Sequence, residues 1–267
     1  MRERESGNTP FTYSLSPLHL QGGKRASDLH DVADKPLFRF VNKDKFFSIP
    51  SFRTFYALLD NYVHVAGIAE DVTPAEKREN AAFIDAIMDT PPMKYLHRYL
   101  SIKGLAPSSI RDFKSEIGRI WFQLYRRKVD NDSSAFEHVF VGEEKDGTVI
   151  GFHNWVQFFI EELKGNLNYL GFILPRRRGR GHEDLPTGNE HVIAVQFQWV
   201  NGNVKNISTS IVGASPAFEI ALYTLMFLAS GDKTDVILDG VDVTIQVHRI
   251  HTPSGMKLSS SFPVMNQ

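Results

Sequence analysis

The spacing of apolar residues changes along this chain, and that change constrains the fold more than any other feature. Before residue 131, apolar side chains recur every three or four positions, which is typical of amphipathic helices. Helix start signals precede two of these segments, at Thr73-Pro74 and at Pro107-Ser108-Ser109. The apolar positions are Phe52, Phe55, Leu58, Leu59 and Tyr62, then Phe83, Ile84, Ile87 and Met88, then Ile110, Phe113, Ile117, Ile120, Trp121 and Leu124. The first half is therefore predicted to be helical.

After residue 134, strand and hairpin signals alternate with helices. Residues 139–141 and 192–200 have the β-branched and aromatic content of strands, and Asn201-Gly202 and Asp239-Gly240 are hairpin signals. Residues 155–164, stopped by Gly165, are a predicted helix, and another opens at Ser215-Pro216. The buried stripe of this last helix is expected to be Phe218, Leu222, Leu225, Met226 and Leu228.

These patterns predict an α+β fold with a helical N-terminal lobe followed by a sheet-rich lobe that carries the chemistry. We expect one domain over residues 31–267, divided into lobes at 31–130 and 131–267. Residues 1–30 are rich in Ser, Gly, Pro and charge, and we expect them to form a flexible arm.

Composition excludes several classes of protein. The chain has no cysteine, which rules out disulfide frameworks, thiol catalysis and cysteine-ligated metals. A formal net charge of -1 argues against a protein that coats nucleic acid through bulk positive potential. The longest apolar run, residues 220–228, is too short to span a bilayer, so no membrane insertion is expected. No signal peptide is evident, which predicts a cytoplasmic or nuclear protein if the chain is complete and a secreted one if it is N-terminally trimmed.

Two histidines have similar aromatic surroundings, in Phe136-Glu137-His138-Val139-Phe140 and in Gly151-Phe152-His153-Asn154-Trp155. Imidazole both accepts and donates protons near neutral pH, so the two side chains are a candidate acid and base pair. Lys205 is a candidate third member, because an ammonium group stabilises charge on an oxyanion or a phosphorane. Cleavage of RNA by its own 2'-hydroxyl needs a base, an acid and a cation, and these residues supply them.

Other interpretations stay open from the residues alone. A histidine beside aromatic residues is often a satisfied interior residue without chemistry. His138 and His153 with Glu137, Glu143 or Glu144 are a candidate metal set, although no His-Glu-x-x-His motif occurs. The arginine-rich segment 175–184 is a candidate for phosphate contact or a solvated loop.

Several segments together resemble the EndoU family of poly(U)-specific endoribonucleases, which is related in its catalytic core to the coronavirus uridylate-specific endoribonuclease. The resemblance rests on both histidine segments, on Leu58-Leu59-Asp60-Asn61-Tyr62, on Lys164-Gly165-Asn166-Leu167, and on Ser215-Pro216 with Phe218-Glu219. It implies the EndoU type of α+β fold. It also implies that His153 is the general base, His138 the general acid and Lys205 the electrostatic partner, with a 2',3'-cyclic phosphate as product.

The resemblance also implies a substrate, further site residues and a cofactor. The substrate is single-stranded RNA rich in uridine, cut by a monomer. Substrate contacts fall on Thr209, Ser210, Gln246 and His248, with Val247 at a position where the family has a hydroxyl side chain. Glu137 and Glu143 match acidic positions linked to a divalent cation, Ca²⁺ or Mn²⁺. The alternative function is an RNA-binding or calcium-responsive protein of the same fold with weak or no turnover.

Overall fold

The computed structural model describes residues 13–19, 30–173, 191–238, 241–252 and 255–265. Its helices are α1 (Lys43–Ser48), α2 (Pro50–Ala57), α3 (Pro74–Met88), α4 (Pro91–Ile102), α5 (Ile110–Phe122), α6 (Trp155–Lys164) and α7 (Pro216–Ala229). Its strands are β1 (Tyr13–Leu15), β2 (Phe38–Val41), β3 (Glu143–Lys145), β4 (Thr148–Ile150), β5 (Leu167–Ile173), β6 (Val192–Trp199), β7 (Asn203–Ile211), β8 (Lys233–Leu238), β9 (Val241–Thr252) and β10 (Gly255–Met265). A π-helical turn spans Glu137–Val141.

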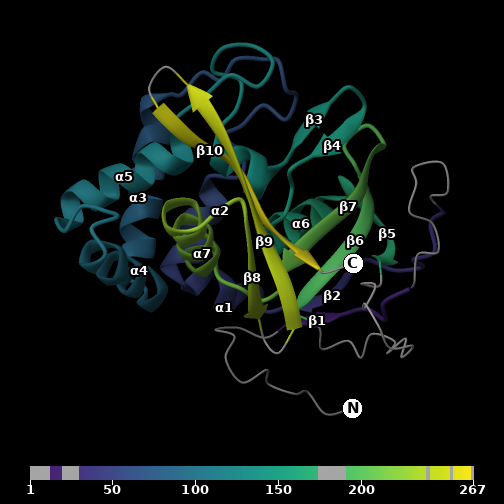
Figure 1. Ribbon diagram of the computed structural model, residues 1–267. Helices are drawn as coiled ribbons and strands as arrows, with labels where there is room; N and C mark the ends of the chain where they lie inside the picture. Colours follow the sequence, from purple (N-terminus) through teal and green to yellow (C-terminus); the bar gives the residue numbers. More distant parts are fainter. Residues whose placement is uncertain (1–12, 20–29, 174–190, 239–240, 253–254, 266–267) are drawn as a thin grey trace.

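The architecture is α+β, as predicted. Helices α3, α4 and α5 gather on one side, and a five-stranded sheet of order β3-β4-β7-β6-β5 lies on the other (Figure 1). A three-stranded antiparallel sheet of order β10-β9-β8 runs between these two parts, and β1 pairs with β2 in a small third sheet. Within the described residues, no helix combines the length and apolar character needed to cross a lipid bilayer.

The helical side has an aromatic core that extends to the first histidine segment. Phe136 packs against Phe122, Phe55 and Phe83, with ring centroids 4.9, 5.6 and 5.8 Å apart. Phe140, one helical turn further on, packs against Trp121 at 5.3 Å. Aromatic pairs at these separations are favourable beyond the area that they bury. The two phenylalanines that flank His138 therefore anchor it to the helices.

The second histidine segment is anchored to the sheet instead. The Phe152 ring lies 4.9 Å from Phe197 and 4.8 Å from Trp199, both on β6. Asn154 caps the start of α6, and Gly165 ends this helix in the left-handed conformation at φ 76°, as the sequence predicts. The predicted hairpin at Asn201-Gly202 is confirmed, because β6 and β7 pair in antiparallel register around it and both residues have positive φ.

Some sequence predictions were wrong. Residues 139–141 form part of the π-helical turn and no strand, because the Gly142 amide donates to the Glu137 carbonyl five residues back. Residues 13–15 of the predicted arm form strand β1, paired with β2. Helix α4 was not predicted, although its buried residues Met93, Leu96 and Leu100 have helical spacing.

The predicted buried stripe of α7 was also largely wrong. The most buried side chains of α7 include Glu219, Tyr223 and Thr224, whereas Phe218, Leu222 and Leu225 are only partly buried. This helix is apolar almost all round, so its periodicity does not select a face. The arginine-rich segment and the Asp239-Gly240 turn lie outside the described residues, and the boundaries at residues 30 and 130 stay predictions.

Candidate active site

His138 lies on the π-helical turn next to an ion pair of the buried Glu143 and the partly buried Arg127. Its Nδ1 contacts the Glu143 Oε2 atom. The same oxygen forms an ion pair with Arg127, whose Nε lies 3.1 Å away. The imidazole is 8% exposed and the Glu143 carboxyl is fully buried. Because Nδ1 is engaged by the carboxyl group, Nε2 is the ring nitrogen that remains for a substrate.

Burial has opposite effects on the proton affinity of these two groups. It lowers the pKa of His138 well below its usual value, and the charges of Arg127 and Lys205 lower it further. Burial raises the pKa of Glu143 to about 7, against the opposing charge of Arg127. Both shifts favour the neutral forms of the two groups, and the charge of Arg127 opposes this for Glu143 by favouring its ionised carboxyl.

His153 follows a strained turn that brings the two histidine segments together. Phe152 has a left-handed backbone at φ 64°, its amide donates to the His138 carbonyl at 3.0 Å, and the His153 amide donates to Val139 at 2.8 Å. Gly151 also has a positive φ, and a Cβ there would overlap the His138 carbonyl oxygen. Only glycine permits this close approach of the two chains.

The His153 ring directly contacts a backbone carbonyl and an aromatic ring. Its Nδ1 lies 3.3 Å from the Thr209 carbonyl oxygen, which makes Nδ1 the protonated nitrogen and leaves Nε2 as a free base. The ring stacks on Phe262 of β10 with centroids 4.2 Å apart and planes 4° from parallel. Burial, and then the charges of Lys205 and His138, lower the pKa of His153 well below its usual value, so the resting imidazole is neutral.

Lys205 completes the cluster. Its side chain is 8% exposed, and burial lowers its pKa to about 8. The β6–β7 pairing shifts register between the Phe197–Lys205 and Val195–Ser208 pairs, and this bulge leaves Lys205 and Ser208 on the same face of the sheet. Ser208 donates its hydroxyl to the Phe152 carbonyl, so Lys205 faces the turn that carries His153. Since Lys205 lowers the pKa of both histidines, the three groups lie within electrostatic reach of each other.

The predicted substrate residues are divided between two strands. Thr209 and Ser210 are adjacent and buried on β7, so their side chains point to opposite faces and only one can meet a given base. On β9, Gln246 Nε2 lies 3.0 Å from His248 Nε2, and the His248 ring stacks with Phe262 at 5.8 Å. Val247 is buried on the other face of β9, so a hydroxyl at this position would point away from Phe262.

The two predicted metal ligands, Glu137 and Glu143, have donor atoms that suit a cation, but they are too few to fill its coordination shell. Both oxygens of Glu137 and the Oε1 atom of Glu143 are buried without a hydrogen-bond partner, and they are hard donors of the kind that Ca²⁺ and Mn²⁺ accept. Burial, and then the charges of Glu143 and Glu70, raise the pKa of Glu137 to about 10. Among the described residues, however, no group of three or more ligating side chains has metal-binding spacing. The carboxyls therefore fit a cation only as part of a shell completed by water.

Comparisons with known proteins agree with this geometry. A family model described as "Endoribonuclease XendoU" matches residues 4–263. The poly(U)-specific endoribonuclease-A of Xenopus laevis is 42% identical over 246 residues, covering 90% of this chain and 81% of that protein. The uridylate-specific endoribonuclease C of Danio rerio is 44% identical over 230 residues, covering 84% and 72%. The chain belongs to the XendoU family.

A solved structure of XendoU, described as a splicing independent snoRNA processing endoribonuclease, supports the same assignment. It matches with a TM-score of 0.78 and 38% sequence identity over 96% of this chain and 89% of that one. This member of the XendoU family is therefore an endoribonuclease with the EndoU type of α+β fold.

Sequence reasoning missed two residues of this XendoU-family site, Arg127 and Phe262, and the role of a third, Glu143. Arg127 follows the last helix of the N-terminal half, and Phe262 lies near the end of the chain, so neither is close in sequence to a histidine. Glu143 was predicted only as a metal ligand, and its contact with His138 was not foreseen. The one local signal was Phe262 itself, a single aromatic residue after the run Ser259-Ser260-Ser261.

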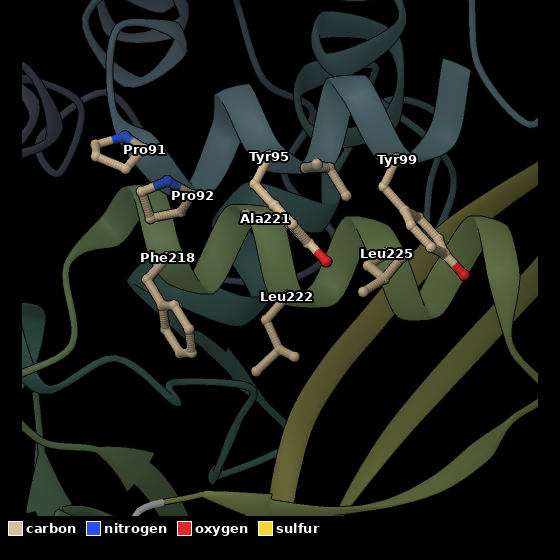
Figure 2. Close-up of a pocket in the computed structure, with 9 residues that line it drawn as sticks. Pro91, Pro92, Tyr95, Tyr99, Phe218, Ala221, Leu222 and Leu225 are labelled. Atoms are coloured by element: carbon tan, nitrogen blue, oxygen red, sulfur yellow. The ribbon is translucent and has the colours of Figure 1, made fainter. Parts of the chain in front are cut away.

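A separate depression lies between α4 and α7 of this XendoU-family protein (Figure 2). Its cavity volume is about 400 Å³. Its walls are formed by proline, tyrosine and aliphatic side chains, which include Leu96, together with Phe218. Its lining contains no histidine, lysine or carboxyl side chain, so it lacks the groups that form the histidine cluster. It contains the α7 side chains that had been expected in the core.

Proposed function

We propose that the protein cleaves single-stranded RNA at uridylates by attack of the 2'-hydroxyl, leaving a 2',3'-cyclic phosphate and a 5'-hydroxyl. The observation that carries this proposal is the gathering of two buried histidines, each with its Nε2 available, around one buried lysine. The names of the similar proteins, poly(U)-specific and uridylate-specific endoribonucleases, support uridine as the preferred base.

His153 is the general base in this proposal. Its Nε2 accepts the proton of the 2'-hydroxyl while the 2'-oxygen forms a bond to phosphorus. The low pKa of His153 keeps the imidazole neutral before reaction, and the Thr209 carbonyl holds the tautomer in which Nε2 is unprotonated. The flat stack on Phe262 restricts ring rotation, which favours a fixed direction of proton transfer.

His138 is the general acid. As the bond from phosphorus to the 5'-oxygen breaks, its Nε2 donates a proton to the departing oxygen. The Glu143 carboxyl at Nδ1 stabilises the protonated imidazole that this step needs, and Arg127 keeps Glu143 oriented. Lys205, still largely protonated at neutral pH, stabilises the additional negative charge of the phosphorane.

The base of the cleaved nucleotide is expected to meet Phe262, Gln246 and His248. Phe262 is only partly buried and stacks with the His153 and His248 rings, so the base is expected to meet its exposed part, and Gln246 and His248 supply hydrogen-bonding groups beside it. Either Thr209 or Ser210 supplies a hydroxyl from the neighbouring strand β7.

A divalent cation, Ca²⁺ or Mn²⁺, is part of the proposal as a stimulating ion outside the bond-breaking steps. Glu137 and Glu143 would hold it, and its charge would offset the cost of ionising two buried carboxyl groups. The proton transfers are complete with two imidazoles and a lysine, so no step needs activation of water by a metal.

The test is cleavage of a short labelled RNA that contains one uridine among adenosines, with Ca²⁺, with Mn²⁺ and with chelator. We expect cutting after the uridine and a cyclic phosphate end, identified by its sensitivity to acid and by mass. A matched RNA in which the uridine carries a 2'-methoxy group should resist cleavage, because the nucleophile is blocked. Binding without any cutting would overturn the proposal and favour an RNA-binding protein, and cutting of the 2'-methoxy RNA would exclude the mechanism.

A further inference from the structure

Glu219 is a buried carboxyl group to which the proposed reaction assigns no role. It lies in the first turn of α7 and is 0% exposed, whereas its helix neighbours Phe218 and Leu222 line the depression on the outer face (Figure 2). Burial of a carboxyl group is costly unless its oxygens are matched by donors. The partners of Glu219 therefore indicate what it does.

Those partners connect Glu219 to the start of α6. Asn154 Nδ2 donates to Glu219 Oε2 at 2.6 Å, and the Tyr223 hydroxyl donates to Oε1 at 3.4 Å. The other end of the Asn154 amide, Oδ1, accepts from the Val156 and Gln157 amides at 2.9 and 3.0 Å. Backbone amides only donate, so they hold the Asn154 Oδ1 atom and leave Nδ2 to donate to the Glu219 carboxyl group.

Asn154 immediately follows His153, so this orientation bears on the base. On its other side, His153 is held by the left-handed Phe152, whose carbonyl accepts from Ser208. The backbone at His153 is thus held on one side by the hydrogen bond from Ser208 to Phe152 and on the other side by the Asn154 cap of α6. Loss of either contact would let the imidazole move relative to its carbonyl partner on Thr209.

We propose that Glu219 is a positioning residue for the base, which acts through Asn154 on His153; the inference rests on the proposed function. The carboxyl group never meets the RNA. It fixes the Asn154 amide, the amide fixes the first turn of α6, and this turn fixes the His153 peptide and its ring. Displacement of a reacting group by about 1 Å costs on the order of 10²-fold in rate, so a small shift has a measurable effect.

The test exchanges the donor and the acceptor of the Asn154–Glu219 hydrogen bond. Asn154→Asp keeps the oxygen that caps α6 but places a second carboxyl group against Glu219. Glu219→Gln in the same chain supplies an amide donor to the new carboxyl and restores the bond with reversed polarity. We expect Asn154→Asp to lower kcat on the uridine RNA at least about tenfold with KM within about twofold, and the double variant to recover most of the loss.

A matched control separates positioning from stability. Thr224, also buried on α7, accepts a hydrogen bond from Trp121 Nε1 at 2.9 Å, whereas the described side-chain hydrogen bonds of Glu219 go to Asn154 and Tyr223. Thr224→Val should lower the free energy of unfolding but leave kcat unchanged. If Asn154→Asp does not fold, Asn154→Ser keeps a capping oxygen that is too short to reach Glu219, and it should show the same loss of kcat.

The outcomes also separate this inference from the proposed function. Wild type and His153→Ala are measured alongside, and absence of cleavage that depends on His153 would overturn both proposals. If wild type cleaves by His153 but Asn154→Asp retains full kcat, or the double variant shows no recovery, the positioning role of Glu219 is wrong and the proposed function stands. Loss of kcat in Thr224→Val equal to that in Asn154→Asp would likewise reduce Glu219 to a stability role.

Discussion

The two histidine segments look alike in sequence and are held in different ways. His138 sits on a π-helical turn anchored to the aromatic core of the helices, and its ring meets a carboxyl group supported by Arg127. His153 follows a left-handed turn anchored to the five-stranded sheet, and its ring meets a backbone carbonyl and Phe262.

The difference in surroundings gives a physical reason why two similar residues would take the opposite roles proposed for them. A carboxyl group at Nδ1 favours the protonated imidazole, which suits an acid, whereas a neutral carbonyl at Nδ1 leaves the unprotonated imidazole favoured, which suits a base. The aromatic residues on either side of each histidine make the two segments look similar, but they pack one segment against the helices and the other against the sheet.

The largest effect is expected from removal of either imidazole. His138→Ala and His153→Ala should each lower kcat on the uridine RNA by about 10²- to 10⁴-fold while the unfolding midpoint stays close to that of wild type. His64→Ala is the matched control, because His64 also packs against an aromatic ring, Trp199, at 4.8 Å but lies outside the cluster. Substantial activity in either catalytic variant would remove the assigned roles.

The next effect concerns Lys205, the proposed cation whose charge acts on both histidines. Burial lowers the pKa of Lys205 to about 8, so the ammonium group is charged at pH 7 and is lost as the pH rises through 8. The profile of kcat/KM against pH should therefore fall above about pH 8. In Lys205→Arg this alkaline fall in kcat/KM should move to higher pH, because the guanidinium group stays charged over the whole range.

Lys257→Arg is the control for this profile. Lys257 is also buried and has a lowered pKa, but its Nζ donates to the Leu124 carbonyl at 3.0 Å outside the cluster. Its substitution should leave the alkaline limb in place. An unchanged limb in an active Lys205→Arg enzyme would assign the titration to another group and leave the acid and base without their proposed cation.

The smallest expected effect is a change in stability at Glu137, the residue next to His138. The pKa of Glu137 is raised from 4.5 to about 10 in the folded protein, so its favourable neutral form is fully present below pH 4.5 and its contribution is lost as the pH rises toward 10. At pH 7 in chelator, Glu137→Gln should therefore unfold no more easily than wild type, with a gain of up to about 3 kcal/mol.

The same pair of proteins tests the cation. Ca²⁺ or Mn²⁺ should raise the unfolding temperature of wild type and have less effect on Glu137→Gln, because one of the two ligands has lost its charge. Ser115→Ala, which alters only an exposed hydroxyl on α5, should respond as wild type does. Equal stabilisation of all three proteins would place the ion away from Glu137.

Local signals predicted much of the fold. The helix start at Thr73-Pro74, the helix end at Gly165 and the Asn201-Gly202 turn each depend on a few neighbouring residues, so the sequence predicted them correctly. The π-helical turn and the buried face of α7 were missed, because both depend on what packs against them. Glu219 and Thr224 face inward on α7 only because Asn154 and Trp121 offer partners there.

The site residues, too, were partly predicted from the sequence and partly missed. His138, His153 and Lys205 were recognised by residue type and by resemblance, and the structure places them in one electrostatic cluster. Their roles as acid, base and cation stay predictions. Arg127 and Phe262 were not found, since they reach the histidines from distant parts of the chain through a carboxyl group and a ring stack.

The division of labour between the two histidines is tested most directly with a uridine 3'-phosphate ester of p-nitrophenol. This leaving group departs as a stable anion and needs no proton, so only the base is required. His138→Ala should cleave the ester within about tenfold of wild type, whereas His153→Ala should stay as impaired as it is on RNA. Equal impairment of both variants on the ester, or recovery of His153→Ala alone, would contradict the assignment of acid and base.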